Sequence, residues 1–126
     1  MSDKVERNNY KELGLPVGPY VHCVKHNSLL YLSGLTAYGT DAQEGSLEEQ
    51  TRAIFDQISL IATREGSSLT NLISVLIHVT DIGDISGLRD ALFDIYGSQT
   101  PISTLVEVSK LFAPGLKVEI TATIAA

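Results

Sequence analysis

The chain has very little cysteine: Cys23 is its single copy among 126 residues. One thiol cannot form a disulfide within the chain, so the fold has no internal disulfide framework. The polar start of the sequence, MSDKVERNNYKE, contains no apolar segment of the kind that directs secretion. Together these features predict a cytoplasmic protein.

Aromatic residues are also scarce, at 6% of the chain, and tryptophan is absent. Because hydrophobic residues still make up 44%, the core must consist mainly of Leu, Ile, Val and Ala. This composition is ordinary for a globular protein, and the length predicts one domain over residues 1–126. No apolar run approaches the roughly 20 residues that a membrane span needs, so no membrane partner is expected.

Basic runs are missing as well, because every Lys or Arg stands alone in the sequence. The formal net charge is −6 and the pI about 4.9, so the mean surface repels phosphate backbones and nucleic acid is not expected as a partner. The three histidines, His22, His26 and His78, lack the spacing of metal ligands. The glycines of SGLTAYG lack phosphate-loop spacing, so neither a metal nor another cofactor is expected.

The first half of the chain predicts a hairpin and a helix. Two apolar runs flank residues 25–28, where Asn27 and Ser28 favour a tight turn. Residues 46–66 then show the start and stop signals of a helix: Ser46 and Glu49 form a capping box, and Gly66 ends the helix. The apolar face predicted for this helix contains Thr51, Ile54, Phe55, Ile58, Ile61 and Ala62.

The second half predicts one strand, one helix and two closing strands. Residues 71–81 alternate between a face with Ile73, Val75, Ile77 and Val79 and a face with Ser74, Leu76, His78 and Thr80. Residues 85–97 form the second predicted helix, with its apolar stripe at Ile85, Leu88, Leu92, Ile95 and Tyr96. Residues 103–111 and 116–125 follow as strands; in the second, Leu116, Val118, Ile120, Ala122 and Ile124 alternate with Lys117, Glu119, Thr121 and Thr123.

The predicted element order, ββ-α-β-α-ββ, indicates an α+β fold with two helices on one sheet. Two helices can cover only one face of such a sheet. The second face contains Leu76 and is not fully polar, so something must bury it. Another copy of the chain is the simplest occupant, and closed cyclic symmetry is the usual form of such assemblies.

Several segments resemble, in order and at matching intervals, the pattern of the YjgF/RidA family. They are GPYVHCV, LYLSG, EEQTRAIFDQI, the strand ending in HVTD, PISTLVEV and VEITATIA, from about Gly18 to Ala126. The resemblance implies a fold like that of the small bacterial chorismate mutases, a ferredoxin-like mixed sheet with both helices on one face. It also implies homotrimers whose sheets form a central barrel, with small-molecule ligand sites in the clefts between subunits.

The best-known members of that family hydrolyse reactive enamines and imines such as 2-aminoacrylate. The resemblance implies that Tyr20 packs against the ligand, that Ser33 and Gly34 line the pocket, and that Glu119 holds the hydrolytic water. A carboxylate can deliver and partly deprotonate such a water. Glu119 is therefore the candidate catalytic residue, while Glu107 in the VEV run is interpreted as structural.

The sequence also departs from the family pattern. An arginine of the family grips the substrate carboxylate bidentately, and Ser103 stands in its place here. Leu105 replaces a cysteine, Arg89 stands where asparagine is usual, and Leu35 follows Ser33 and Gly34 where glutamine is common. Ser103 and Arg89 are therefore candidate substrate-binding residues of an altered site. A serine can hydrogen-bond a ligand but cannot supply the lost charge.

Each candidate also has a structural interpretation. Glu119 can be a solvated residue of an alternating strand, Tyr20 an interface aromatic, Ser33 a strand-end hydrogen-bonding residue and Arg89 a solvated helix residue. Three functions remain open. They are a hydrolase acting on a small imine or enamine, a non-catalytic ligand-binding or regulatory trimer, and the endoribonuclease or translation-inhibitor activity with which relatives are often labelled, which the acidic charge disfavours.

Overall fold

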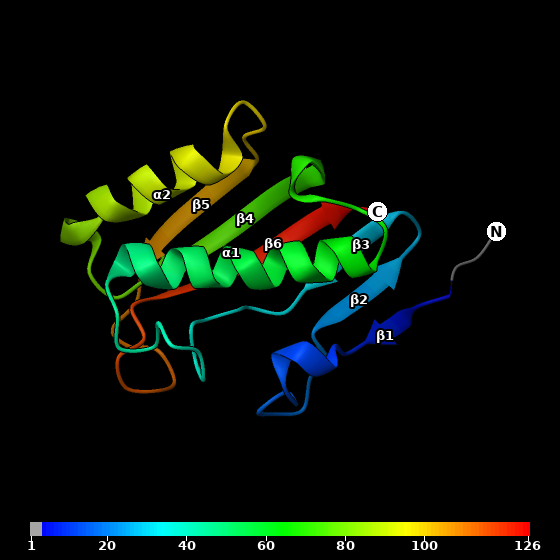
Figure 1. Ribbon diagram of the computed structural model, residues 1–126, viewed down its shortest axis with the longest axis horizontal. Coiled ribbons are helices and arrows are strands. Elements are labelled where there is room, and N and C mark those ends of the chain that lie inside the picture. Colours follow the sequence, from blue (N-terminus) through cyan, green and yellow to red (C-terminus); the bar gives the residue numbers. More distant parts are fainter. Residues whose placement is uncertain (1–3) are drawn as a thin grey trace.

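Six strands form one mixed sheet in the computed structural model, which describes residues 4–126. The strands lie in the spatial order β1-β2-β3-β6-β4-β5 (Figure 1), with β4 and β5 parallel and the other neighbouring pairs antiparallel. In chain order they are β1 (Glu6–Asn8), β2 (Cys23–His26), β3 (Leu29–Leu32), β4 (Leu72–Val79), β5 (Ile102–Glu107) and β6 (Val118–Ala125).

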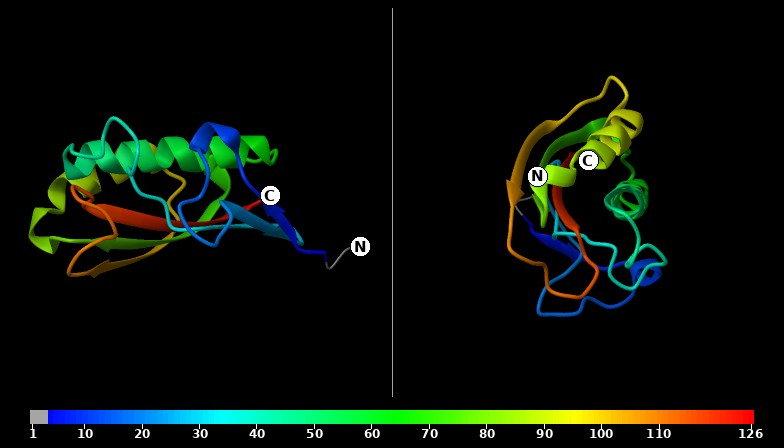
Figure 2. Two further views of the ribbon diagram at one scale, coloured as in Figure 1. Left: turned by 90° about the horizontal axis from the view of Figure 1, so that it is seen from below. Right: turned by 90° about the vertical axis from the view of Figure 1, so that its left-hand side faces the viewer.

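Two α-helices, α1 (Leu47–Arg64) and α2 (Ser86–Tyr96), lie on the same side of the sheet (Figure 2). Short 3-10 helices occur at Lys11–Leu13, Leu69–Asn71 and Ile82–Asp84. The predicted α+β fold, with both helices on one face of a mixed sheet, is confirmed. The edge strand β1 was not predicted, because its sequence ERN contains no apolar alternation.

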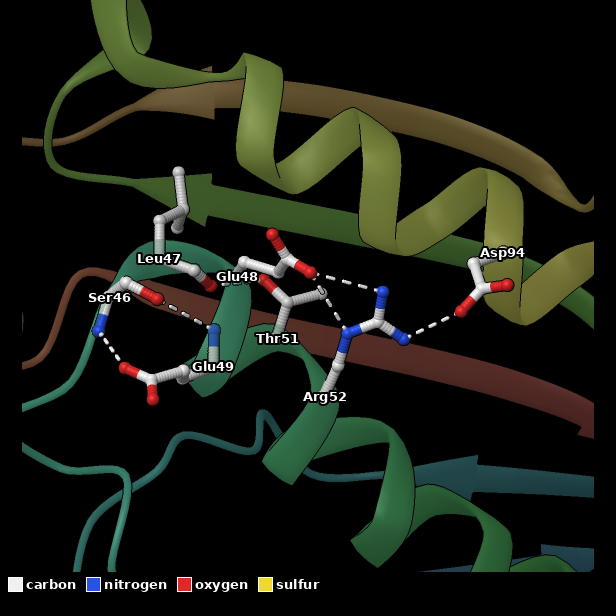
Figure 3. A network of polar contacts seen from close by, with 7 residues as sticks. All are labelled: Ser46, Leu47, Glu48, Glu49, Thr51, Arg52 and Asp94. Carbon is white, nitrogen blue, oxygen red and sulfur yellow. Dashed lines mark hydrogen bonds and ion pairs between the residues drawn. The ribbon is translucent and has the colours of Figure 1, made fainter.

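Helix α1 begins and ends as its sequence predicts. The Ser46 hydroxyl accepts a hydrogen bond from the Glu49 N–H at 3.0 Å, and the Glu49 carboxylate accepts one from the Ser46 N–H at 2.8 Å (Figure 3). Gly66, just after the helix, has φ +78°, a conformation that glycine adopts without strain. All six residues of the predicted apolar face are buried.

Helix α2 packs beside α1 through apolar side chains and one bridging arginine. Leu88 and Ala91 are buried, and the other residues of the predicted stripe pack against the core from partly buried positions. Arg52 of α1 contacts Glu48 at 3.2 Å and Asp94 of α2 at 2.9 Å (Figure 3). These side chains are 41–69% exposed, so water screens the ion pairs and the apolar contacts dominate the packing.

The expectation that Ile73 shares a face with Val75, Ile77 and Val79 is wrong. The register between β4 and β6 shifts between Leu72 and Ser74, as in a β-bulge. A bulge adds one residue to one strand, so the side-chain alternation changes phase there. Leu72 is therefore buried, whereas Ile73 is 40% exposed.

The sheet face away from the helices, here called the open face, has no covering layer among residues 4–126. Strand β6 alternates as predicted: Val118, Ile120, Ala122 and Ile124 are buried under the helices. Glu119, Thr121 and Thr123 therefore lie on the open face. Its exposed apolar side chains are Tyr31, Leu76, Ile102 and Val106. The predicted uncovered face containing Leu76 is thus confirmed.

A buried glutamine joins the loop before α1 to the loop before β6. The Gln50 side chain is fully buried, and its amide nitrogen donates to the Gly115 carbonyl at 2.7 Å and the Gln43 carbonyl at 3.0 Å. Its amide oxygen accepts from the Lys117 N–H at 2.8 Å. One side chain thereby holds the start of α1 against the start of β6, the strand that contains Glu119.

Candidate functional site

The carboxylate of Glu119 lies directly against Gly34. A Cβ atom built at Gly34 would come within 2.7 Å of Glu119 Oε2, so a larger residue at position 34 would displace the carboxylate. An isolated bridge between Leu35 and Ile120 holds the two segments together. Glu119 is half-buried, and within residues 4–126 its carboxylate has no hydrogen-bond or ion-pair partner. It is therefore free to bind a ligand or a water.

Ser33 and Tyr20 lie beside this contact. The Ser33 hydroxyl donates to the Val21 carbonyl at 2.7 Å, and the Ser33 N–H donates to the His22 carbonyl at 3.1 Å. These bonds attach the segment after Tyr20 to the end of β3. The Tyr20 ring packs over Gly18 and is 45% exposed. The fold thus brings Tyr20, Ser33, Gly34 and Glu119 into one region, from segments about a hundred residues apart.

Two hollows adjoin this region, and Tyr20 and Ser33 line both of them. The first has a volume of about 90 Å³, includes Gly34, and is closed on the helix side by Gln57 of α1 and by the buried His22. Exposed apolar residues, Leu15, Val17, Tyr38 and Phe112, form its rim. The second hollow has a volume of about 500 Å³ and is bordered by Arg7 of β1 and Tyr31 of β3.

His22 forms a rigid, uncharged wall of the first hollow. Burial lowers the pKa of the His22 imidazole, so its neutral form predominates at neutral pH. Its Nδ1 accepts a hydrogen bond from the Tyr10 N–H at 3.0 Å, and its ring stacks on that of Tyr10. The Tyr10 hydroxyl donates to Glu65 at 2.7 Å; burial, followed by this bond, raises the pKa of Tyr10. No sequence pattern marks this cluster, because its members lie far apart in the chain.

His78 lies directly opposite Glu119 across the β4–β6 pair. Directly opposed residues of an antiparallel pair share a face and have Cβ atoms about 5 Å apart. His78 is half-buried on the open face, and among residues 4–126 its buried Nδ1 has no hydrogen-bond partner.

Ser103 and Arg89 do not lie with Glu119 within the chain. Ser103 pairs with the buried Val75, so it lies on the helix-side face of the edge strand β5, opposite to the face of Glu119. Arg89 lies exposed on α2, which is also on the helix side. Either residue can join a site containing Glu119 only from a neighbouring copy. Their substrate-binding roles stay predictions.

Glu107 and Cys23 have structural surroundings. Glu107 accepts a hydrogen bond from the Ile82 N–H at 2.8 Å, which links β5 to the connection between β4 and α2; its structural interpretation stays a prediction. Cys23 is fully buried, and burial raises the pKa of its thiol, which disfavours the nucleophilic thiolate. In the described part of the chain, no three His, Cys, Asp or Glu side chains are grouped to hold a metal ion.

Fold and site together define a class of protein. It is an α+β protein whose sheet is covered by two helices on one face, with a carboxylate lying against a glycine on the other. Neither helix among residues 4–126 has the length and apolarity needed to cross a membrane.

A family model described as "Endoribonuclease L-PSP" matches residues 12–126. The chain therefore belongs to this family, which is also called the YjgF/RidA family. The mitochondrial protein mmf2 of Schizosaccharomyces pombe is 32% identical over 106 residues, which cover 82% of this chain and 84% of that protein. A RutC family protein of Pyrococcus abyssi is 26% identical over 99 residues, covering 76% of this chain and 78% of the relative.

Solved structures agree with this membership. A Mycobacterium tuberculosis protein described as a member of the YjgF family has 27% identity and a TM-score of 0.83, covering 98% of this chain and all of that chain. A Pseudomonas aeruginosa protein of unknown function has 27% identity and a TM-score of 0.87, with 97% and 92% covered.

Proposed function

We propose that the protein binds a small metabolite and hydrolyses an imine or enamine in a cleft between subunits. The observation that carries this proposal is the Glu119 carboxylate, which lies over Gly34 and has no hydrogen-bond or ion-pair partner in the described part of the chain. A half-buried carboxylate without a partner has its lone pairs available for a water. The adjoining hollows beside Tyr20 and Ser33 offer space for the ligand.

The chemistry needs one base and one water. Glu119 takes a proton from water as the oxygen adds to the carbon of the protonated C=N bond. The same carboxylate returns that proton to the nitrogen of the carbinolamine, ammonia leaves, and the hydroxyl proton is lost as the carbonyl forms. An enamine enters this sequence after protonation at carbon converts it to the imine. A single carboxylate serves as both base and acid in this scheme.

The site also requires a partner subunit, and we propose a homotrimer. Leu76, Ile102 and Val106 form an exposed apolar area on the β4–β5 half of the open face, which a second copy can cover. We further propose that the protein works in the cytoplasm and does not act on nucleic acid. The net charge of −6 supports the second point.

A charge at Leu76 is expected to weaken the assembly. Replacing Leu76 with Asp places an unpaired carboxylate in the proposed interface, which costs several kcal/mol and should raise the dissociation constant at least about 100-fold. Sedimentation velocity over a concentration series measures this change. Phe93→Asp is the matched control, because Phe93 is 73% exposed on α2, away from the open face. A wild-type monomer at micromolar concentration, or equal weakening by both variants, would contradict the proposed interface.

Hydrolysis of 2-aminoacrylate is expected to be weak or absent. Ser103 cannot grip the carboxylate that lies next to the reacting carbon of this three-carbon substrate, and Arg89 lies on the opposite side of the sheet from Glu119. A coupled assay with serine or threonine dehydratase measures ammonia release. A rate like that of arginine-bearing relatives would show this prediction to be wrong and would require another cation beside Glu119.

The alternative is a non-catalytic binding or regulatory trimer. The missing positive charge at position 103 favours this alternative. A protein that only binds its ligand does not need to hold the carboxylate of a substrate next to a catalytic base. Imines that an amino-acid oxidase generates from a range of amino acids provide the test. Acceleration of ammonia release by the wild-type protein supports the hydrolase, and binding without acceleration for every imine supports the alternative.

A further inference from the structure

The second hollow, here called the Arg7 groove, lies on the open face. Its wall includes Arg7, Tyr20, Val24, Tyr31, Leu32 and Ser33. We propose that Arg7 binds the carboxylate of a small organic acid in this groove. The volume of about 500 Å³ lies within the range of small-molecule sites, which is roughly 300–1,000 Å³.

Strand register places Arg7 on the open face. Arg7 pairs with Val24, Val24 pairs with Tyr31, and Tyr31 pairs with Thr123 of β6. Directly opposed residues of antiparallel strands point to the same side of a sheet. Arg7 therefore shares the face of Thr123 and Glu119, in a row that crosses the β1–β3 half of the sheet.

The Arg7 side chain is exposed, and within residues 4–126 it has no hydrogen-bond or ion-pair partner. Among residues 4–126, no carboxylate lines the groove, although the chain has 15 acidic and 9 basic residues. The Arg7 guanidinium therefore has no counter-ion among the described residues of the groove. Its planar fork matches a carboxylate bidentately, so an organic acid completes the charge balance.

The remaining walls favour an acid with an apolar body. Pro19, Val21 and Val24 supply apolar surface along the groove. The Ser33 hydroxyl already donates to the Val21 carbonyl, so toward a ligand it can only accept. Tyr31 and Tyr20 supply phenolic groups that can donate to a carboxylate. The groove thus combines one cation and two phenols with an aliphatic lining.

This arrangement also restricts the ligand. Glu119 precedes Thr123 by four residues on β6, or about 13 Å along the strand, and Arg7 lies three strands across from Thr123. A three-carbon acid is too short to contact both groups. If the ligand is the substrate, a step that rests on the proposed function, its carboxylate is separated by several bonds from the carbon that reacts at Glu119.

The apolar area proposed to bind a second copy lies on β4 and β5, whereas the Arg7 groove lies on β1 to β3. Association through β4 and β5 therefore leaves the Arg7 groove at the border of the interface, where it remains open to a ligand.

Binding of hexanoate and of its neutral isostere hexanamide tests the inference. NMR titration of the full chain should show that hexanoate binds more tightly than hexanamide. Arg7→Gln should weaken hexanoate binding about 10- to 100-fold, the effect of a charge-assisted hydrogen bond, and leave hexanamide unchanged. Lys25→Gln is the matched control, because this substitution also removes one positive charge. Lys25 lies on the same two strands, paired with Glu6, but on the opposite face of the sheet.

Three results would overturn the inference: no preference of the wild-type protein for hexanoate, equal weakening by Lys25→Gln, or weakening by Arg89→Gln but not by Arg7→Gln. Arg7-dependent binding of hexanoate by a protein that hydrolyses no imine supports the groove and refutes only the proposed hydrolase.

Discussion

Replacing Glu119 with Gln is expected to reduce imine hydrolysis about 10²- to 10⁴-fold, the range for loss of a general base. Glutamine keeps the size of the side chain that lies over Gly34 but cannot accept a proton from water at neutral pH. The fold should survive, because within residues 4–126 the Glu119 carboxylate makes no hydrogen bond or ion pair that the change would break. Ammonia release under single-turnover conditions measures the rate, and the circular dichroism spectrum checks the fold.

Glu107→Gln provides the matched control. It removes the same charge, and its amide oxygen can still accept the hydrogen bond from the Ile82 N–H. We expect its rate to stay within about 2-fold of the wild-type rate, since a glutamate remote from the reacting atoms supplies no general-base catalysis. Equal losses in the two variants would indicate a general effect of charge. An unchanged rate in Glu119→Gln would remove Glu119 as the base. If the protein only binds its ligand, Glu119→Gln should alter affinity modestly and change no rate.

Replacing Gln50 with Leu is expected to lower the free energy of unfolding by about 2–4 kcal/mol. Leucine has a similar volume, so the loss comes from hydrogen bonds rather than from a cavity. The change leaves the Lys117 N–H and the Gly115 carbonyl without their present partner between two packed loops. Urea-induced unfolding at fixed protein concentration measures the change.

Gln57→Leu is the control for this substitution on the same helix. Gln57 is half-buried, and its principal hydrogen bond goes to the Thr36 carbonyl at 2.9 Å. Its loss should cost about 0.5–1.5 kcal/mol, the usual net value of one hydrogen bond. A Gln50→Leu variant as stable as Gln57→Leu would mean that water replaces the Gln50 amide at both loops. Lys117, which Gln50 holds, directly precedes β6, the strand that contains Glu119. The Gln50 variant should therefore lose hydrolytic activity at denaturant concentrations below those that unfold the whole protein.

The structure changes the interpretation of the missing arginine at Ser103. From the sequence, Arg89 was a candidate substrate-binding residue, because it departs from the family pattern. Within the chain, however, Arg89 lies on the helix side, whereas the unpaired Arg7 lies on the open face in a groove shared with Tyr20 and Ser33. Arg7 belongs to a strand of three residues that no periodic pattern marks, so sequence reasoning could not find it.

The sequence by itself determined those features that depend on neighbouring residues. Ser46, Glu49 and Gly66 fixed the ends of α1, because capping acts within one turn of a helix. The alternation of residues in β6 predicted that Glu119 points away from Val118 and Ile120, because successive side chains of a strand point to opposite faces. The order of elements and the resemblance of ordered segments were enough to predict the fold and the family.

Only the tertiary structure decided which segments meet. Placing β6 between β3 and β4 brings Gly34 against Glu119 and His78 opposite it, and adding β1 at the edge brings Arg7 beside Tyr20. The bulge that exposes Ile73 likewise depends on the register with β6. Such pairings join residues far apart in the chain. They are stabilised by the pairing of strand edges and by the burial of surfaces, which occur only when the chain folds. No local pattern of side chains predicts these pairings.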